Sequence, residues 1–301
     1  MIAASARRPI PHHRRMQFHP VEVRRRCTDL GGVARTAELA AIGIDEHSLK
    51  MAVLGGEIIR IREGVYGAAD APHDVIAAVA HGGRLGCLSR IRAAGLWVLD
   101  RNDVRVHVSM PRTGNARRHV DCRCVTHWTG GPAVGGFAPL VESLAQVLQC
   151  FGIEDFFVAL ESAMSKRLLN HRSLHELGGR LPRMHRWLVG FARWDAGSGL
   201  ESVLRLRLRA LGISLVSQVE IPGAGRVDFV LAGLIVLEVD GIVGHADLAS
   251  SRHKDLVRDA VASTYGLEAL RFDYAMVVHD WPLVEAAILA ALDRSRRRRS
   301  R

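Results

Sequence analysis

The chain has 301 residues, 48% of them hydrophobic and 24% charged, which is the composition of an ordinary globular protein with two or three domains. Its net charge of +10 suits an acidic partner such as DNA, although the basic excess is nearly all arginine and equally fits a high-GC genome. No run of about 18 apolar residues and no signal-peptide core is found, which excludes a membrane partner and favours a cytoplasmic protein.

A basic tail and a winged helix-turn-helix are predicted at the N-terminus. Residues 1–19 are expected to form a disordered basic tail, in which Met16 is an alternative start. Between residues 20 and 72, three short helices precede a hairpin, at 21–30, 36–41, 45–54 and 57–66, with Asp45 as the cap of the third helix. This order is typical of a winged helix-turn-helix, whose wing is the hairpin.

Three stretches of this region carry a family resemblance, namely 31–39 (GGVARTAEL), 43–44 (GI) and 55–66 (GGEIIRIREGVY). They resemble the N-terminal domain of AbiEi-type antitoxins over about 50 residues, a usual length for such a domain. The resemblance implies a DNA-binding autoregulator. His47, Ser48 and Lys50 are then expected to read base edges, and Arg60 and Arg62 to contact phosphates. A structural or protein-docking winged helix is the alternative.

Residues 73–196 are predicted to form a mixed α/β middle segment. A helical stretch at 73–92 precedes strands at 104–110 and 119–126, and helices follow at 140–150, at 154–169 and from a capping box at Ser173. Cys122 and Cys124 are expected on one face of the second strand. Because a Cys-x-Cys pair without a second pair of ligands is a weak zinc motif, buried reduced thiols are favoured, and His107 and His127 are interpreted in the same way.

Residues 197–293 are predicted to form a mixed sheet flanked by helices, so the chain as a whole is expected to be α/β (α+β). The predicted order is helix 200–211, strand 215–220, a two-stranded hairpin turning at Ala232-Gly233, helix 253–265, strand 267–272 and helix 281–292. Residues 294–301 follow as a solvated, arginine-rich tail.

Carboxylates interrupt the apolar hairpin at three positions. Asp228 lies within its first strand, and Glu238 and Asp240 end its second strand. A turn centred on Gly233 places Asp228 opposite Glu238, with Cβ atoms about 5 Å apart. Like charges this close need a cation or a shared proton, so the pattern predicts a divalent-metal site.

The surrounding residues carry a second resemblance, through 198–201 (SGLE), Gln218, 226–229 (RVDF), 238–241 (EVDG), His245, Asp255, Arg258, Asp259 and Arg271. They resemble the PD-(D/E)xK nuclease superfamily, in its branch similar to very-short-patch-repair (Vsr) endonucleases, which includes a domain of unknown function. The resemblance implies a restriction-endonuclease-like αβββαβα domain that hydrolyses phosphodiesters.

The resemblance also implies roles for individual residues. Asp228 and Glu238 would be ligands of Mg²⁺ or Mn²⁺, with the Val239 carbonyl as a further donor. Asp240 occupies the position where most of the superfamily has lysine. His245 is the candidate proton-transfer group in its place, since an imidazole pKa near 6.5 suits that chemistry.

The remaining candidates have two interpretations each. Glu201 either closes a capping box with Ser198 or leans over the metal, and the two are compatible. Asp255, Arg258 and Asp259 are spaced to pair along one helix face as a solvated salt-bridge network, and Arg258 is alternatively a DNA-contacting residue. Arg271 either steadies the site or contacts a phosphate.

Two functions therefore stay open. The first is a Mg²⁺-dependent DNA endonuclease whose winged helix positions the DNA. The second is a non-catalytic DNA-binding regulator or antitoxin-like protein with a degenerate nuclease fold. A small-molecule enzyme with a similar metal patch is a third interpretation, although no nucleotide-binding glycine motif is present. A toxin partner or a homodimer is compatible with either of the first two.

Overall fold

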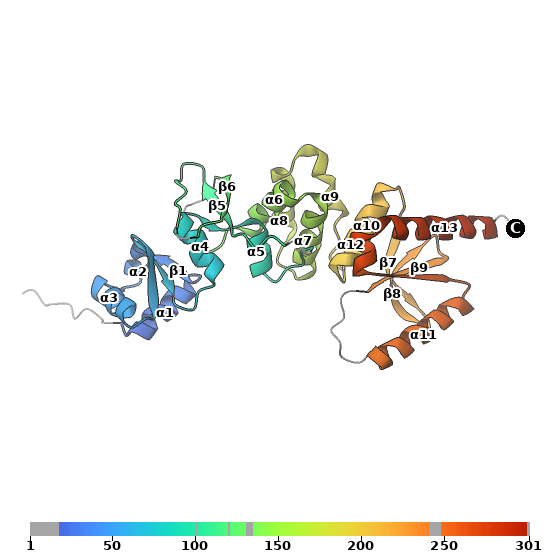
Figure 1. The fold of residues 1–301 in the computed structure, drawn as a ribbon, viewed down its shortest axis with the longest axis horizontal. Helices are drawn as coiled ribbons and strands as arrows, with labels where there is room; N and C mark the ends of the chain where they lie inside the picture. Colours follow the sequence, from blue (N-terminus) through green and yellow to red (C-terminus); the bar gives the residue numbers. More distant parts are fainter. Residues whose placement is uncertain (1–17, 100–101, 120, 131–134, 241–247, 300–301) are drawn as a thin grey trace, which may run out of the picture. The chain divides into compact units, whose positions relative to one another are not determined.

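The computed structural model describes residues 18–99, 102–119, 121–130, 135–240 and 248–299, with the backbone alone at 248–255 and 299. The chain divides into two compact units, one of Met1–Leu85 with Arg105–Ala138 and one of Gly86–Val104 with Pro139–Arg301. Both units combine helices with small sheets (Figure 1), so the predicted mixed α/β class is confirmed. Of the predicted tail at 1–19, only residues 18 and 19 are described, so Met16 lies outside the described residues.

The first unit begins with three helices and a three-stranded sheet. Its elements are α1 (Pro20–Asp29), β1 (Val33–Arg35), α2 (Thr36–Ala41), α3 (Glu46–Leu54), β2 (Ile58–Arg62) and β3 (Val65–Ala68). β3 lies between β1 and β2 and is antiparallel to both. Asp45 caps α3, as predicted, because its Oδ1 accepts the Ser48 N–H at 2.8 Å. The predicted helices and hairpin are therefore present.

The rest of the first unit is a second small sheet beside α4 (His73–His81). β4 (Arg84–Leu85), β5 (His107–Pro111) and β6 (Val125–Thr129) form this sheet, with β4 antiparallel and β6 parallel to β5. The single helix predicted at 73–92 is wrong. It ends at Gly82, whose φ of +111° is left-handed, and Gly83 follows so close to β5 that a Cβ there would lie 2.6 Å from Val108 Cγ1.

The predicted strand at 119–126 is also wrong over most of its length. β6 begins only at Val125, and Asp121 has a left-handed φ of +53°, which an extended strand does not accommodate. The segment that carries His119, Cys122 and Cys124 is therefore a loop. Cys122 and Cys124 do not line a strand face.

The second unit opens with a helical layer. Its helices are α5 (Cys87–Ala93), α6 (Leu140–Phe151), α7 (Ile153–Ser165), α8 (His171–Arg180), η1 (Arg183–His185) and α9 (Trp187–Phe191). Phe156 and Phe157 are fully buried in the core of this layer. The capping box predicted at Ser173 is wrong, because α8 is capped by Asn170, whose Oδ1 accepts the Ser173 N–H at 2.9 Å.

A four-stranded sheet completes the second unit. Its elements are α10 (Gly199–Ala210), β7 (Leu215–Ile221), β8 (Gly225–Leu231), β9 (Ile235–Asp240), α11 (Leu248–Thr264), β10 (Glu268–Asp273), α12 (Tyr274–His279) and α13 (Trp281–Arg299). The strand order is β10-β9-β8-β7, with β10 parallel to β9 and the other pairs antiparallel. The predicted mixed sheet is present. The helix α12 was not predicted. The last helix, α13, was predicted to end at residue 292 but continues through most of the arginine-rich end.

Both faces of this sheet are covered by helices. On one face Phe229 and Leu237 pack with Val203 of α10 and Ile288 of α13. On the other face Val236 packs against Val261 of α11, and Figure 1 shows α11 opposite α10 and α13. Glu238, near the end of the central strand β9, is therefore buried beside this apolar packing.

Candidate functional site

The hairpin of β8 and β9 opens at the predicted carboxylates. The backbone ladder runs from Leu231 opposite Ile235 to Phe229 opposite Leu237 and ends there. Continued by one step, this register would place Asp228 opposite Glu238, the pair that the sequence predicted, but the ladder itself does not include that pair. At this step the Asp228 carboxylate accepts the Val239 N–H at 2.9 Å. A side-chain acceptor thus lies between the two strands, and it holds Asp228 beside the end of β9.

Burial changes the acidity of both carboxylates. It raises the pKa of Asp228 and of Glu238, and the negative charges of their neighbours raise both further. For Asp228 the Val239 N–H opposes this shift, and for Glu238 the arginines Arg271 and Arg258 oppose it. The pair therefore favours an added cation or proton.

Two arginines already balance the charge of Glu238. Its Oε1 pairs with Arg258 at 2.5 Å and its Oε2 with Arg271 at 2.7 Å, and Glu238 is only 6% exposed. Arg258 also donates to the carbonyls of Ala224 and Arg226, at 3.0 and 2.7 Å. Arg258 of α11 therefore binds residues of β8 and β9 and the turn before β8. The prediction had paired it only with residues of its own helix.

Asp259, another residue of the predicted pairing along that helix face, also contacts the sheet. Asp259 Oδ1 pairs with Arg271 at 3.0 Å. The Asp255 side chain lies outside the described residues. Arg271 thus joins two carboxylates, which supports the interpretation that it steadies the site.

Glu201 lies at the start of α10, and the charge of Asp228 affects its pKa. Ser198 Oγ accepts the Glu201 N–H at 3.2 Å, as a helix cap does. The Glu201 carboxylate accepts from Gly197 N–H at 3.1 Å and from Gln218 Nε2 at 2.8 Å, so it reaches one residue beyond the predicted Ser198 amide. Burial, with the Asp228 charge second, raises the pKa of Glu201 to about 7.

The remaining predicted ligands are placed as follows. Asp240 is exposed at the end of β9, and it is the amide of Val239, not its carbonyl, that meets Asp228. His245 lies outside the described residues. Within the described ranges, the carboxylate oxygens do not form a set of three that all lie within 4.8 Å of one another. Metal ligation by this patch stays a prediction.

The predicted DNA-contacting residues differ in exposure. His47 and Lys50 of α3 and Arg60 of β2 are exposed. Arg62 is partly buried and donates to the Val79 carbonyl at 3.2 Å. Ser48 is buried and its hydroxyl accepts the Phe18 N–H, so its expected place on the reading face is wrong.

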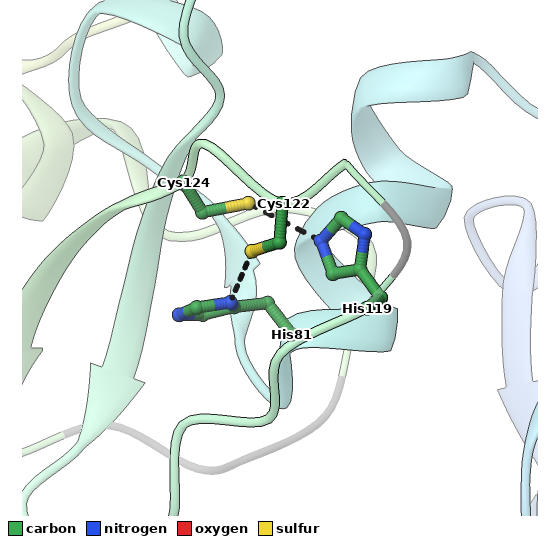
Figure 2. A group of neighbouring side chains, drawn as sticks. All are labelled: His81, His119, Cys122 and Cys124. Atoms are coloured by element: carbon green, nitrogen blue, oxygen red, sulfur yellow. Dashed lines mark hydrogen bonds between the residues drawn. The ribbon is translucent and has the colours of Figure 1, made fainter.

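A group of four metal-ligand side chains in the first unit was missed from the sequence (Figure 2). It comprises His81 at the end of α4 with His119, Cys122 and Cys124 of the loop before β6, and one ligand atom of each lies within 4.8 Å of the others. His81 Nδ1 lies 3.3 Å from Cys122 Sγ, and His119 Nε2 lies 3.4 Å from Cys124 Sγ. The local His-x-x-Cys-x-Cys spacing was a visible signal, whereas His81 is 41 residues from Cys122.

The two other histidines of interest pair with each other. His107 Nδ1 lies 3.1 Å from His127 Nε2 across β5 and β6, and burial lowers the pKa of His127 to about 4. The His127 ring is therefore held neutral where it meets His107.

Comparisons with known proteins give no family for the chain. It matches no protein-family model, and a search of curated proteins finds no match. No helix in the described part of the chain is long and apolar enough to cross a membrane. The function of the chain is therefore inferred from the chemistry of the residues described above.

Proposed function

We propose that this protein is a metal-dependent DNA endonuclease with a PD-(D/E)xK-like C-terminal domain. The observation that carries the proposal is the junction of β8 and β9, where Asp228 bonds the amide next to Glu238 in a largely buried setting. Glu201 adds a third acidic group, whose pKa is raised first by burial and second by the Asp228 charge. Carboxylates whose pKa is shifted by burial and by charged neighbours cluster at functional sites, although structural ion-pair networks shift pKa values as well.

The donor set suits a hard divalent cation. Carboxylate oxygens are the ligands that Mg²⁺ and Mn²⁺ prefer, and Asp228 and Glu238 would hold the ion. When bound, such an ion supplies an activated water and neutralises charge on the phosphate. Glu238 has to release Arg258 or Arg271 to present an oxygen. A released guanidinium is itself a bidentate donor suited to a phosphate group.

The first unit supplies features suited to DNA. Its three helices and β2–β3 hairpin have the order of a winged helix-turn-helix, and His47, Lys50 and Arg60 are exposed on α3 and β2. Arginine and lysine on these elements favour phosphate contacts. The net charge of +10 supports the same class of partner.

A non-catalytic DNA-binding regulator is the second candidate. One observation favours it: Glu238 already pairs with Arg258 and Arg271, so the charge of this one carboxylate is balanced without a metal. Asp240, which replaces the usual lysine of the superfamily, also favours it. In this case the C-terminal domain would support folding or a protein partner such as a toxin.

Plasmid cleavage separates the two candidates. Wild-type protein is incubated with supercoiled plasmid and Mg²⁺ or Mn²⁺, beside Asp228→Asn and the control Glu220→Gln, which alters an exposed carboxylate of the same sheet. Asp228→Asn is expected to remove about 3 kcal/mol of metal-dependent stabilisation of the transition state, which corresponds to about a 100-fold lower nicking rate. The control should keep its rate.

Two results would decide against the enzyme. Equal cleavage by wild type and Asp228→Asn would assign the activity to a contaminant. No cleavage by a wild-type protein that still shifts DNA in a gel, and shifts it equally after the mutation, would support the regulator.

A further inference from the structure

We infer that His81, His119, Cys122 and Cys124 form a structural zinc site in the first unit. The four side chains point toward one another from the end of α4 and from the loop before β6 (Figure 2). This site is separate from the carboxylate patch of the second unit and does not depend on the nuclease proposal.

The spacing of the ligand atoms is close to that of a tetrahedral zinc site. With Zn–S of about 2.3 Å and Zn–N of about 2.05 Å, the nitrogen–sulfur edges of the tetrahedron are roughly 3.6 Å long. The two edges from His81 to Cys122 and from His119 to Cys124 measure 3.3 and 3.4 Å. All four atoms lie within 4.8 Å of one another, so small rotations of the side chains bring them into register around one ion.

Neighbouring groups hold the ligands in position. The second ring nitrogen of His81, Nε2, lies 3.0 Å from Thr126 Oγ1, which sets the ring orientation and leaves Nδ1 facing Cys122. His81 is 5% exposed, and its carbonyl accepts the Arg117 N–H at 2.8 Å, which ties the loop to the end of α4. Hydrogen bonds to the outer nitrogen of a ligating histidine are usual in protein metal sites.

The ligand types select the metal and its role. Two thiolates and two imidazoles in a tetrahedral arrangement favour Zn²⁺, whereas Mg²⁺ and Mn²⁺ prefer oxygen donors. Four protein ligands fill the coordination shell, which is the pattern of a structural and not a catalytic zinc. Zinc here would replace the two thiol protons and join the end of α4 to a loop 41 residues away.

This cross-link has a clear place in the fold. The loop is irregular, its residue Asp121 has a left-handed φ, and it leads directly into β6, the edge strand that pairs only with β5 among the described strands. A metal bound to the loop and to α4 would secure that edge strand. Two packed histidine–thiol pairs without a metal are the alternative that the experiment addresses.

Metal analysis of the full chain tests the site. We expect the wild-type protein, purified without chelator, to contain one more equivalent of zinc than Cys122→Ser/Cys124→Ser. Cys27→Ala, which removes a buried thiol of the same unit outside the cluster, should keep that equivalent. Equal zinc contents in wild type and the double variant would overturn the proposal.

Cobalt substitution provides a readout that does not need a variant to fold. Titration of metal-free wild type with Co²⁺ should produce thiolate-to-cobalt charge transfer and the intense visible bands of tetrahedral cobalt, and Zn²⁺ should displace them. Thr126→Val, which removes only the bond to His81 Nε2, should weaken zinc binding about 10-fold. Absence of the charge-transfer band in wild type, or octahedral bands alone, would refute the assignment.

Discussion

Replacing Glu201 with glutamine should make the second unit more stable at alkaline pH. In the native protein this carboxyl is buried, and its pKa is raised from the ordinary 4.5 to about 7, first by burial and second by Asp228. Its folded-state pKa exceeds the unfolded value, so the protonated form favours folding below about pH 4.5. That contribution is lost as the pH rises through 7.

The size of the effect follows from the two pKa values. A rise from 4.5 to about 7 corresponds to about 3 kcal/mol between the two protonation states. Glutamine does not titrate, and its carbonyl oxygen can still accept from Gly197 and Gln218. Between pH 5 and pH 8 the free energy of unfolding of wild type should therefore fall by roughly 2 to 3 kcal/mol relative to that of the variant.

Hydrogen exchange of the α10 and β8 amides measures this difference in the relevant part of the chain. Opening free energies are compared between wild type and Glu201→Gln across that pH range, with Glu220→Gln as the exposed control on the same sheet. Adding Asp228→Asn to wild type should reduce the pH dependence, because it removes the second cause of the shift. Parallel pH profiles for wild type and Glu201→Gln would refute the argument.

Two further substitutions test the packing of each unit. Arg205→Met should cost about 3 to 5 kcal/mol, because it leaves the fully buried Glu161 without its ion-pair partner, and Glu161→Gln added to Arg205→Met should restore part of this loss. Urea unfolding of wild type and of these two variants measures both effects. Gly83→Ala should destabilise the first unit by about 1 to 3 kcal/mol, because its Cβ would collide with the Ser109 carbonyl of β5, and unchanged exchange of the β5 amides would contradict this.

Local features of the chain were predictable because they depend on neighbouring residues. Asp45 caps α3 since a carboxylate at that position reaches the first-turn amides. The Ala232-Gly233 turn formed as expected, with φ of +52° and +69°, and a turn of known length sets the register of a hairpin. That register brings Asp228 to the end of β9, where it accepts the Val239 N–H.

Other features depended on segments that are distant in sequence. The apolar pattern of 73–92 is compatible with one helix, and only the close approach of β5 to Gly83 shows why it breaks. The pairing of Glu238 with Arg258 and Arg271 required α11 and β10 to meet β9, and the site with His81 required a loop 41 residues away to fold back onto α4. Residue spacing carries no information about such contacts, because their geometry is set by the packing of whole elements.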